Sequence, residues 1–248
     1  MKITRRNAWT GMCALIRNAW RLPFIKALAA SVLEDAATFE MWRKSRIRSL
    51  PLADVRLGLG TSFEVLYEAT KGATTLLEAY VLLSLVRSHH AHSFFEFGTF
   101  QGQTSFMLAK NFPHLSVYTL DLPATGVDRT AIPLSIGERR YVEKPTIGSK
   151  FLGTPEQAKI TQLSGDSAAF DYSPYLGKMD FVFVDGCHDY EYIRNDTAHA
   201  LKLLGEKGAI LWHDYLTYGS VSRYLNELGR ELPLRHIQNT SFVLYVRT

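Results

Sequence analysis

The stretch Ser93-Phe94-Phe95-Glu96-Phe97-Gly98-Thr99-Phe100-Gln101-Gly102-Gln103-Thr104 decides the fold of this 248-residue chain. Apolar residues around one acid are followed by Gly-x-x-x-Gly and then by a helical pattern over residues 105–110. This order predicts a strand, a tight turn and a helix, with free backbone amides at the carboxyl edge of a sheet. Because Gly98 and Gly102 lack a Cβ, we expect a small ligand to lie against the backbone there.

The spacing of these glycines indicates which kind of ligand fits. A dinucleotide fingerprint requires Gly-x-Gly-x-x-Gly, and position 100 is Phe. The next predicted strand, residues 115–120, is followed by Asp121, where a carboxylate can accept both hydroxyls of a ribose. The alternatives to this nucleoside site are a turn without a ligand and an acid that only caps the strand.

Composition bounds the class of protein. Hydrophobic residues make up 46% of the chain and charged residues 21%, as is ordinary for a packed soluble protein. The two cysteines, Cys13 and Cys187, exclude a disulfide framework and suit a reducing, cytoplasmic compartment. No apolar run reaches the roughly 18 residues of a membrane-spanning helix, so none is expected.

Charge separates an amino-terminal segment, residues 1–56, from the rest of the chain. It holds 11 Lys and Arg against 4 Asp and Glu, whereas residues 57–248 hold 17 against 20. We expect this segment to be helical, with Trp9, Trp20 and Trp42 among its basic residues. It can form a lid, a contact within a homo-oligomer or a peripheral membrane contact. No nucleic-acid-binding motif accompanies the charge, so nucleic acid is not an expected partner.

Residues 57–248 are expected to form one α/β domain. A helix over residues 74–88 ends at His89, His90 and His92, which we interpret as a solvated helix end and not as a metal site. Residues 122–158 are rich in Pro and Gly, and we expect an irregular lid on the ligand side of the sheet. A short strand, residues 160–163, leads to Asp166 and Ser167, which can meet an adenine ring.

Two further predicted strands carry the chemistry. Residues 179–184 read as a strand buried on both faces and end at Asp185-Gly186-Cys187-His188, and residues 209–212 end at His213-Asp214-Tyr215. If these strands are neighbours about 5 Å apart, Asp185 and Asp214 converge, and their charges repel unless a cation or a proton intervenes. Oxygen ligands without thiolates favour Mg²⁺, Mn²⁺ or Ca²⁺.

These motifs carry a resemblance to a known family. Glu96-x-Gly98-x-x-x-Gly102 resembles the first motif of class I S-adenosylmethionine (SAM) methyltransferases of the catechol O-methyltransferase type. Phe183-Val184-Asp185-Gly186-x-His188-x-Tyr190 with Gly208-x-Ile210-x-x-His213-Asp214 resembles the metal-dependent branch, which includes macrolide-sugar O-methyltransferases and cephalosporin-hydroxylase-like proteins. The likeness covers residues 72–248. It implies a Rossmann-like, doubly wound, mostly parallel sheet of seven strands, with the last strand antiparallel.

The resemblance also implies an activity and roles for single residues. The activity is SAM-dependent O-methylation of a small molecule or a sugar. Asp185 and Asp214 would hold Mg²⁺ or another divalent cation, and His188 would be the base. His213 is placed with the metal, although the family often has an acid at this position. The expected SAM contacts are Glu96, Gly98, Thr99, Gly102, Thr104, Asp121, Asp166, Ser167 and Asp185.

Methyl transfer from a sulfonium is an in-line displacement, so such an enzyme must place an acceptor oxygen against the methyl carbon while a base removes the proton. The alternative for His188 is a structural histidine that caps the following helix. Two other functions stay open. One is an Fe(II) oxygenase that uses His188, His213 and one Asp, against which the nucleoside site argues. The other is a non-catalytic SAM-binding protein, against which the intact acids and His188 argue.

Overall fold

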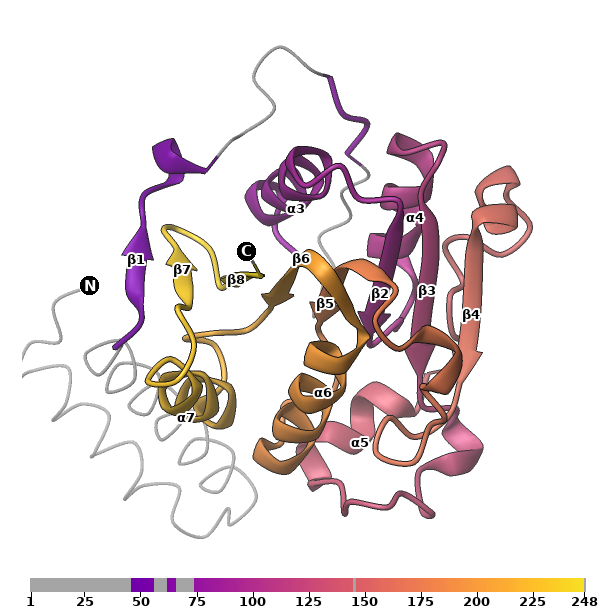
Figure 1. Cartoon of the computed structure of the whole chain (residues 1–248). Coiled ribbons are helices and arrows are strands. Elements are labelled where there is room, and N and C mark those ends of the chain that lie inside the picture. The colour runs from indigo at the N-terminus through magenta and orange to yellow at the C-terminus, as the bar shows by residue number, and fades with distance from the viewer. Residues whose placement is uncertain (1–45, 56–61, 66–73, 145, 248) are drawn as a thin grey trace, which may run out of the picture. The chain divides into compact units, whose positions relative to one another are not determined.

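A computed structural model describes residues 46–55, 62–65, 74–144 and 146–247 (Figure 1). The predicted basic helices with Trp9, Trp20 and Trp42 lie outside the described residues. Among the described residues, the helices are too short or too polar for any of them to cross a membrane.

Eight strands form one sheet in the order β1-β7-β8-β6-β5-β2-β3-β4. β8 runs antiparallel to both of its neighbours, and all other pairs are parallel. The strands are β1 (Arg48–Leu50), β2 (Ser93–Phe97), β3 (Ser116–Asp121), β4 (Ile160–Ser164), β5 (Met179–Val184), β6 (Leu204–Trp212), β7 (Arg235–Ile237) and β8 (Val243–Arg247). The doubly wound fold and the antiparallel last strand are therefore confirmed.

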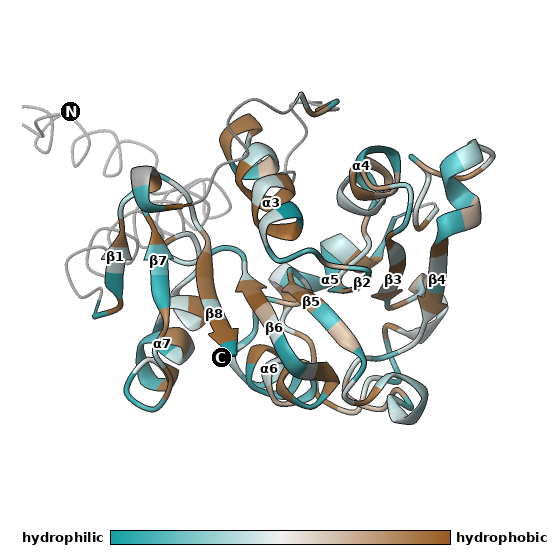
Figure 2. Cartoon of the chain, turned by 45° about the horizontal axis from the view of Figure 1, so that its top comes forward, coloured by the Kyte–Doolittle hydropathy of each residue, from teal (hydrophilic) through white to brown (hydrophobic). Residues whose placement is uncertain are grey.

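Helices cover both faces of this sheet. They are α3 (Leu76–Ser88), α4 (Gln103–Asn111), α5 (Ile136–Val142), α6 (Tyr190–Leu203) and α7 (Gly219–Leu228). Figure 2 shows α3 and α4 on one face and α6 and α7 on the other. Alternate residues of β2 enter the two apolar cores, because Phe94 packs with α3 and α4 and Phe95 packs with α6 and α7.

The order of strands determines where a ligand can bind. The chain runs outward from β2 through β3 to β4 and then returns to β5, which pairs with the other side of β2. The carboxyl ends of β2 and β5 are thus a topological switch point, where open α/β sheets leave a crevice for ligands. The glycine turn follows β2, and Asp185 follows β5.

Three expectations for the secondary structure are wrong. Arg48–Leu50 was expected to be helical, but it pairs with Arg235–Ile237 and gives the sheet its eighth strand. The insertion, residues 122–158, is not irregular throughout, because it contains α5 and two short 3₁₀ turns, Ala124–Gly126 and Pro155–Lys159. β6 begins at Leu204, directly after α6, and not at residue 209.

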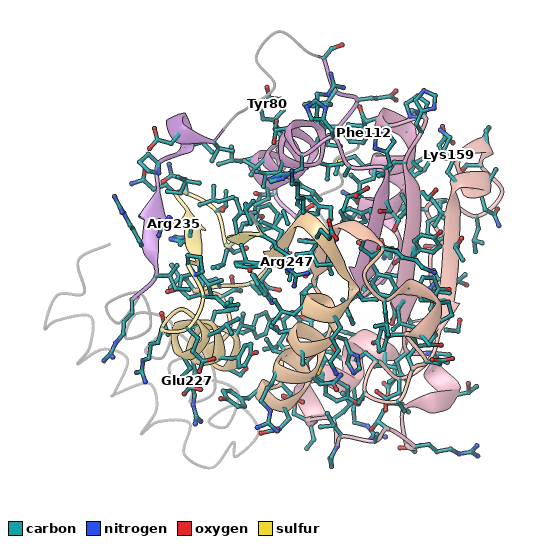
Figure 3. The ribbon with its side chains drawn as sticks, viewed as in Figure 1. Tyr80, Phe112, Lys159, Glu227, Arg235 and Arg247 are labelled. Atoms are coloured by element: carbon teal, nitrogen blue, oxygen red, sulfur yellow. The ribbon has the colours of Figure 1, made fainter. Side chains whose placement is uncertain are left out.

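Long side chains link the ends of strands to the ends of helices; Figure 3 labels two of them, Arg247 and Lys159. The Arg247 guanidinium, at the end of β8, donates to the carbonyl oxygens of Leu201, Leu204 and Gly205 at 2.8–3.0 Å. The Lys159 Nζ, which precedes β4, donates to the carbonyl oxygen of Ala109 on α4 at 2.8 Å. These charged hydrogen bonds occupy carbonyls that the ends of α4 and α6 leave without a helical partner.

Candidate active site

The glycine turn has the backbone that its sequence predicts, but for a different reason. Gly98 and Gly102 have φ values of 91° and 82°, which favour glycine. A Cβ on Gly98 would lie 2.1 Å from the carbonyl oxygen of Asp185, and one on Gly102 would lie 2.4 Å from the ring of Phe151. The end of β5 lies against Gly98 and the insertion lies against Gly102, so both glycines are required for the chain to pack on itself.

Glu96 lies beneath the turn in the protein core, where it is 1% exposed. Its Oε2 accepts hydrogen bonds from the hydroxyls of Ser105 at 2.6 Å and Thr119 at 2.5 Å. Thr99 joins this group through a 2.7 Å hydroxyl contact with Thr119, and the predicted contact Thr104 is also buried. Burial raises the pKa of Glu96 to about 8. These side chains support the turn from below.

Asp121 lies beside the turn, as predicted, and both of its carboxylate oxygens have partners. The backbone amide of Phe100 donates to Oδ2 at 2.6 Å, and the Lys144 Nζ donates to Oδ1 at 2.8 Å. Burial raises the pKa of Asp121, although the nearby Lys144 ammonium opposes this. Lys144 belongs to the insertion and was not among the predicted site residues.

Asp166 and Ser167 follow β4 and face the insertion and α6. The backbone amide of Ala131 donates to Asp166 Oδ2 at 2.6 Å, and the Tyr192 hydroxyl donates to Oδ1 at 3.0 Å. The carbonyl oxygen of Ser167 accepts from the hydroxyl of Tyr172 at 2.9 Å. The structure therefore places both residues at the same edge of the sheet as Asp121, with their polar groups engaged by the chain.

The ends of β5 and β6 bring Asp185, His213 and Asp214 together, as the pairing of Val184 with Trp212 requires. His213 Nδ1 lies 2.8 Å from Asp185 Oδ1 and 3.4 Å from Asp214 Oδ2. Asp214 has a φ of 62°, an uncommon conformation for a residue with a side chain. Such backbone conformations persist where the surrounding structure holds them, often at functional sites.

His188 lies between two carboxylates from distant parts of the chain. Its Nε2 is 2.8 Å from Asp214 Oδ2, and its Nδ1 is 3.1 Å from each carboxylate oxygen of Glu138 on α5. The backbone amide of His188 also donates to Glu138 Oε2 at 3.0 Å. The ring of Tyr218 stacks on the His188 imidazole, with ring centroids 3.9 Å apart. The Tyr218 hydroxyl lies 2.8 Å from the Tyr141 hydroxyl.

These contacts form a chain of alternating acids and imidazoles. Beyond His213, its Nε2 lies 3.6 Å from Oε2 of Glu78, a buried residue of α3. Burial alone would lower the pKa of His188, but the hydrogen bonds to Asp214 and Glu138 raise it to about 10. The pKa of His213 is also raised well above its ordinary value, because the charges of Asp185 and Asp214 outweigh burial.

The group that fits a metal ion differs in one member from the predicted one. Ligand atoms of Asp185, His188 and Asp214 all lie within 4.8 Å of one another. His213 is not in this group, since its two nitrogens face Asp185 and Glu78. Two carboxylates and one imidazole suit a divalent cation, and the nitrogen ligand favours Mn²⁺, Fe²⁺ or Zn²⁺ relative to Mg²⁺. An oxygenase site with two histidines and one carboxylate does not match this set.

Sequence reasoning missed Glu78, Glu138, Lys144 and Tyr218. Thr75 and Glu78 match a capping box, and the structure contains one at the start of α3. That pattern predicts a helix start, but it does not predict that Glu78 Oε1 also accepts from the amide and hydroxyl of Ser241 at 2.8 and 2.7 Å. Glu138 and Lys144 lie in the insertion, whose path no local pattern determines.

The sequence around this site matches the model of a known protein family. The model of a methyltransferase domain matches residues 95–215, from β2 to just beyond β6. This part of the chain therefore matches a methyltransferase domain. The matched residues of this methyltransferase domain include the glycine turn, Asp121 and the ends of β5 and β6.

Individual relatives of the methyltransferase domain are distant. An uncharacterized protein, R132, of Acanthamoeba polyphaga mimivirus is 26% identical over 151 residues, a match that spans 59% of this chain and 63% of that protein. The O-methyltransferase TomG of Streptomyces achromogenes, solved with SAM, is 20% identical over 71% of this chain and 82% of its own, with a TM-score of 0.49. A Staphylococcus aureus structure assigned as a caffeoyl-CoA O-methyltransferase is 13% identical over 71% and 85% of the two chains, with a TM-score of 0.50. At these identities the likeness to solved structures concerns the fold alone.

Proposed function

We propose that this chain transfers a methyl group from SAM to a hydroxyl group of a small molecule or a sugar. The observation that carries the proposal is the meeting of two sites at one switch point. The glycine turn and Asp121 follow β2 and β3, and Asp185, His188 and Asp214 follow β5 and β6. A nucleoside-binding edge beside a cluster of acids and imidazoles suits methyl transfer to an oxygen better than binding alone.

The cofactor half of the site would work through the backbone of the turn and through Asp121. Asp121 would accept ribose hydroxyls, while the backbone of the turn would face the polar end of the cofactor. Asp166 and Ser167 lie at the same edge and would border the adenine. When bound, SAM supplies the electrophilic methyl group.

In the acceptor half, His188 would take the proton of the acceptor hydroxyl. Glu138 holds Nδ1 and fixes the orientation of the ring, so that Nε2, which lies 2.8 Å from Asp214 Oδ2, is the atom that would exchange a proton. The two carboxylates that raise the pKa of His188 also make its neutral form a stronger base. Asp185 and Asp214 would hold a divalent cation, which would lower the pKa of a bound hydroxyl, while His188 takes the proton.

An acceptor screen tests this proposal. The purified chain is incubated with SAM and with sugars or catechols, and methylated products are measured by mass spectrometry. We expect a product whose mass is increased by one methylene unit, and we expect a chelator to abolish its formation. Methylation at the parental rate by His188→Ala would refute the role of His188 as the base. A screen without any methylated acceptor, on a chain that binds SAM, would favour the non-catalytic SAM-binding alternative.

A further inference from the structure

The insertion between β3 and β4, residues 122–158, is bonded directly to the glycine turn. The amide of Gly148 donates to the carbonyl oxygen of Phe100, and that of Lys150 donates to the carbonyl oxygen of Gln101, both at 2.9 Å. The ring of Phe151 fills the space beside Gly102 and is 1% exposed. This part of the insertion therefore lies where the turn offers its backbone to a ligand.

Lys144, also in the insertion, forms a buried ion pair with Asp121 beside the turn. Its ion pair with Asp121 is 2.8 Å long, and the two side chains are only 8% and 10% exposed. The Lys144 Nζ also donates to the carbonyl oxygen of Tyr141 at 3.0 Å and lies 5.8 Å from the ring centre of Phe100. The long, flexible side chain of Lys144 thus holds its ammonium group against the Asp121 carboxylate, which is the proposed acceptor for the ribose hydroxyls.

The acids around the turn explain why a cation is held there. Glu96, Asp121 and Asp185 approach the turn from three adjacent strands. Besides burial, the charges of Asp185 and Asp121 raise the pKa of Glu96, so the three carboxyl groups interact electrostatically. Lys144 offsets the negative charge of Asp121, and SAM, whose sulfonium is also a cation, would suit the same surroundings.

We propose that Lys144 is an intramolecular latch that competes with the cofactor for Asp121. Ribose hydroxyls can reach the Asp121 carboxylate only when the Lys144 ammonium moves away from it. Residues 148–151 of the insertion then detach from the glycine turn. The apparent affinity for the cofactor is reduced by the fraction of molecules in which the latch is closed. This inference rests on the proposed function, because it requires that the turn binds SAM.

The test compares S-adenosylhomocysteine (SAH) binding by calorimetry for the parent, Lys144→Met and Lys144→Arg. Methionine removes the charge but keeps an unbranched side chain, and arginine keeps the charge. Arg139→Met is the matched control, because Arg139 forms an ion pair with Asp128 inside the insertion and does not reach the turn. We expect Lys144→Met to bind SAH on the order of tenfold more tightly, as the loss of a charged hydrogen bond predicts, and the other two variants to resemble the parent.

Hydrogen exchange without ligand gives an independent measurement. The amides of Gly148 and Lys150 should exchange faster in Lys144→Met than in the parent and in Arg139→Met. Equal or weaker SAH binding by Lys144→Met, or unchanged exchange, would overturn the latch while leaving the cofactor site intact. Absence of SAH binding by the parent and by every variant would instead refute the proposed function, and the latch with it.

Discussion

At the scale of single residues, Gly98 is where the structure changes the interpretation of the sequence most. The sequence predicts a positive φ and a ligand, whereas the structure shows a positive φ and the backbone of Asp185 against the missing Cβ. A pattern of glycines gives the conformation of a turn because conformation is local. It does not give the neighbour that requires it, since Asp185 is far away in the chain and reaches the turn only when β5 pairs with β2.

Gly98→Ala should therefore destabilise the fold and not only weaken ligand binding. The new Cβ would combine a strained φ with a distance of only 2.1 Å to the carbonyl oxygen of Asp185, and we expect a loss of at least about 2 kcal/mol. Gly153→Ala is the matched control, because Gly153 has a φ of 76° but nothing within 4 Å of a Cβ. It should cost about 1 kcal/mol, the strain of the backbone alone. Urea unfolding measures both, and equal losses would contradict the packing role of Gly98.

Glu96 should make stability depend on pH. Its folded pKa is about 8 and its ordinary value is 4.5, so the unfolded chain loses this proton first as the pH rises. The contribution of Glu96 to stability is therefore full below pH 4.5 and is lost as the pH rises toward 8. Glu96→Gln keeps an acceptor for Ser105 and Thr119 but cannot ionise, so its free energy of unfolding should decline less over this range. The exposed Glu206→Gln serves as the control, and a parental slope in Glu96→Gln would refute this role.

At the scale of elements, the apolar runs of the sequence determine most strands and helices. β5 and β2 were predictable because their residues are apolar and β-forming and are bounded by turns. β1 was not, because its three residues are two exposed polar side chains and one leucine, and only pairing with β7 makes them a strand. The positions of the acids and of His188 were predictable because these residues directly follow the apolar strands. Glu138 was not, because α5 is a short helix in a long insertion.

Helix α5 should matter for the rate through Glu138. Removing this carboxylate by Glu138→Ala frees Nδ1 and the backbone amide of His188, and we expect the turnover number to fall at least about tenfold because the base loses its orientation. SAM binding should stay close to the parental value, since Glu138 does not touch the glycine turn. Glu143→Ala, an exposed acid at the other end of the same helix, is the control. An equal effect of both changes would point to the stability of α5 and not to His188.

At the scale of the whole molecule, the sheet brings together the two halves of the proposed site, and mutation can separate their roles. The proposed cofactor edge follows β2 and β3, and the acidic cluster follows β5 and β6. Asp185→Asn and Asp214→Asn should each lower the affinity for Mn²⁺ or Mg²⁺ and the rate of methyl transfer together. Binding of SAM should survive in Asp214→Asn, because Asp214 follows β6 and is not part of the glycine turn. Metal titration of activity checks this, and full parental activity in a chelator would exclude a required cation.

The central claim is that the turn after β2 binds SAM, and calorimetric titration of the parent chain with SAM tests it most directly. We predict saturable binding of one equivalent with a dissociation constant in the micromolar range that is common for enzyme substrates. Lys144→Met isolates the acceptor role of Asp121 from the latch, so Asp121→Ala in that background should bind at least about tenfold more weakly than Lys144→Met alone. No saturable heat up to about 1 mM SAM, or equal affinities for these two variants, would contradict the account.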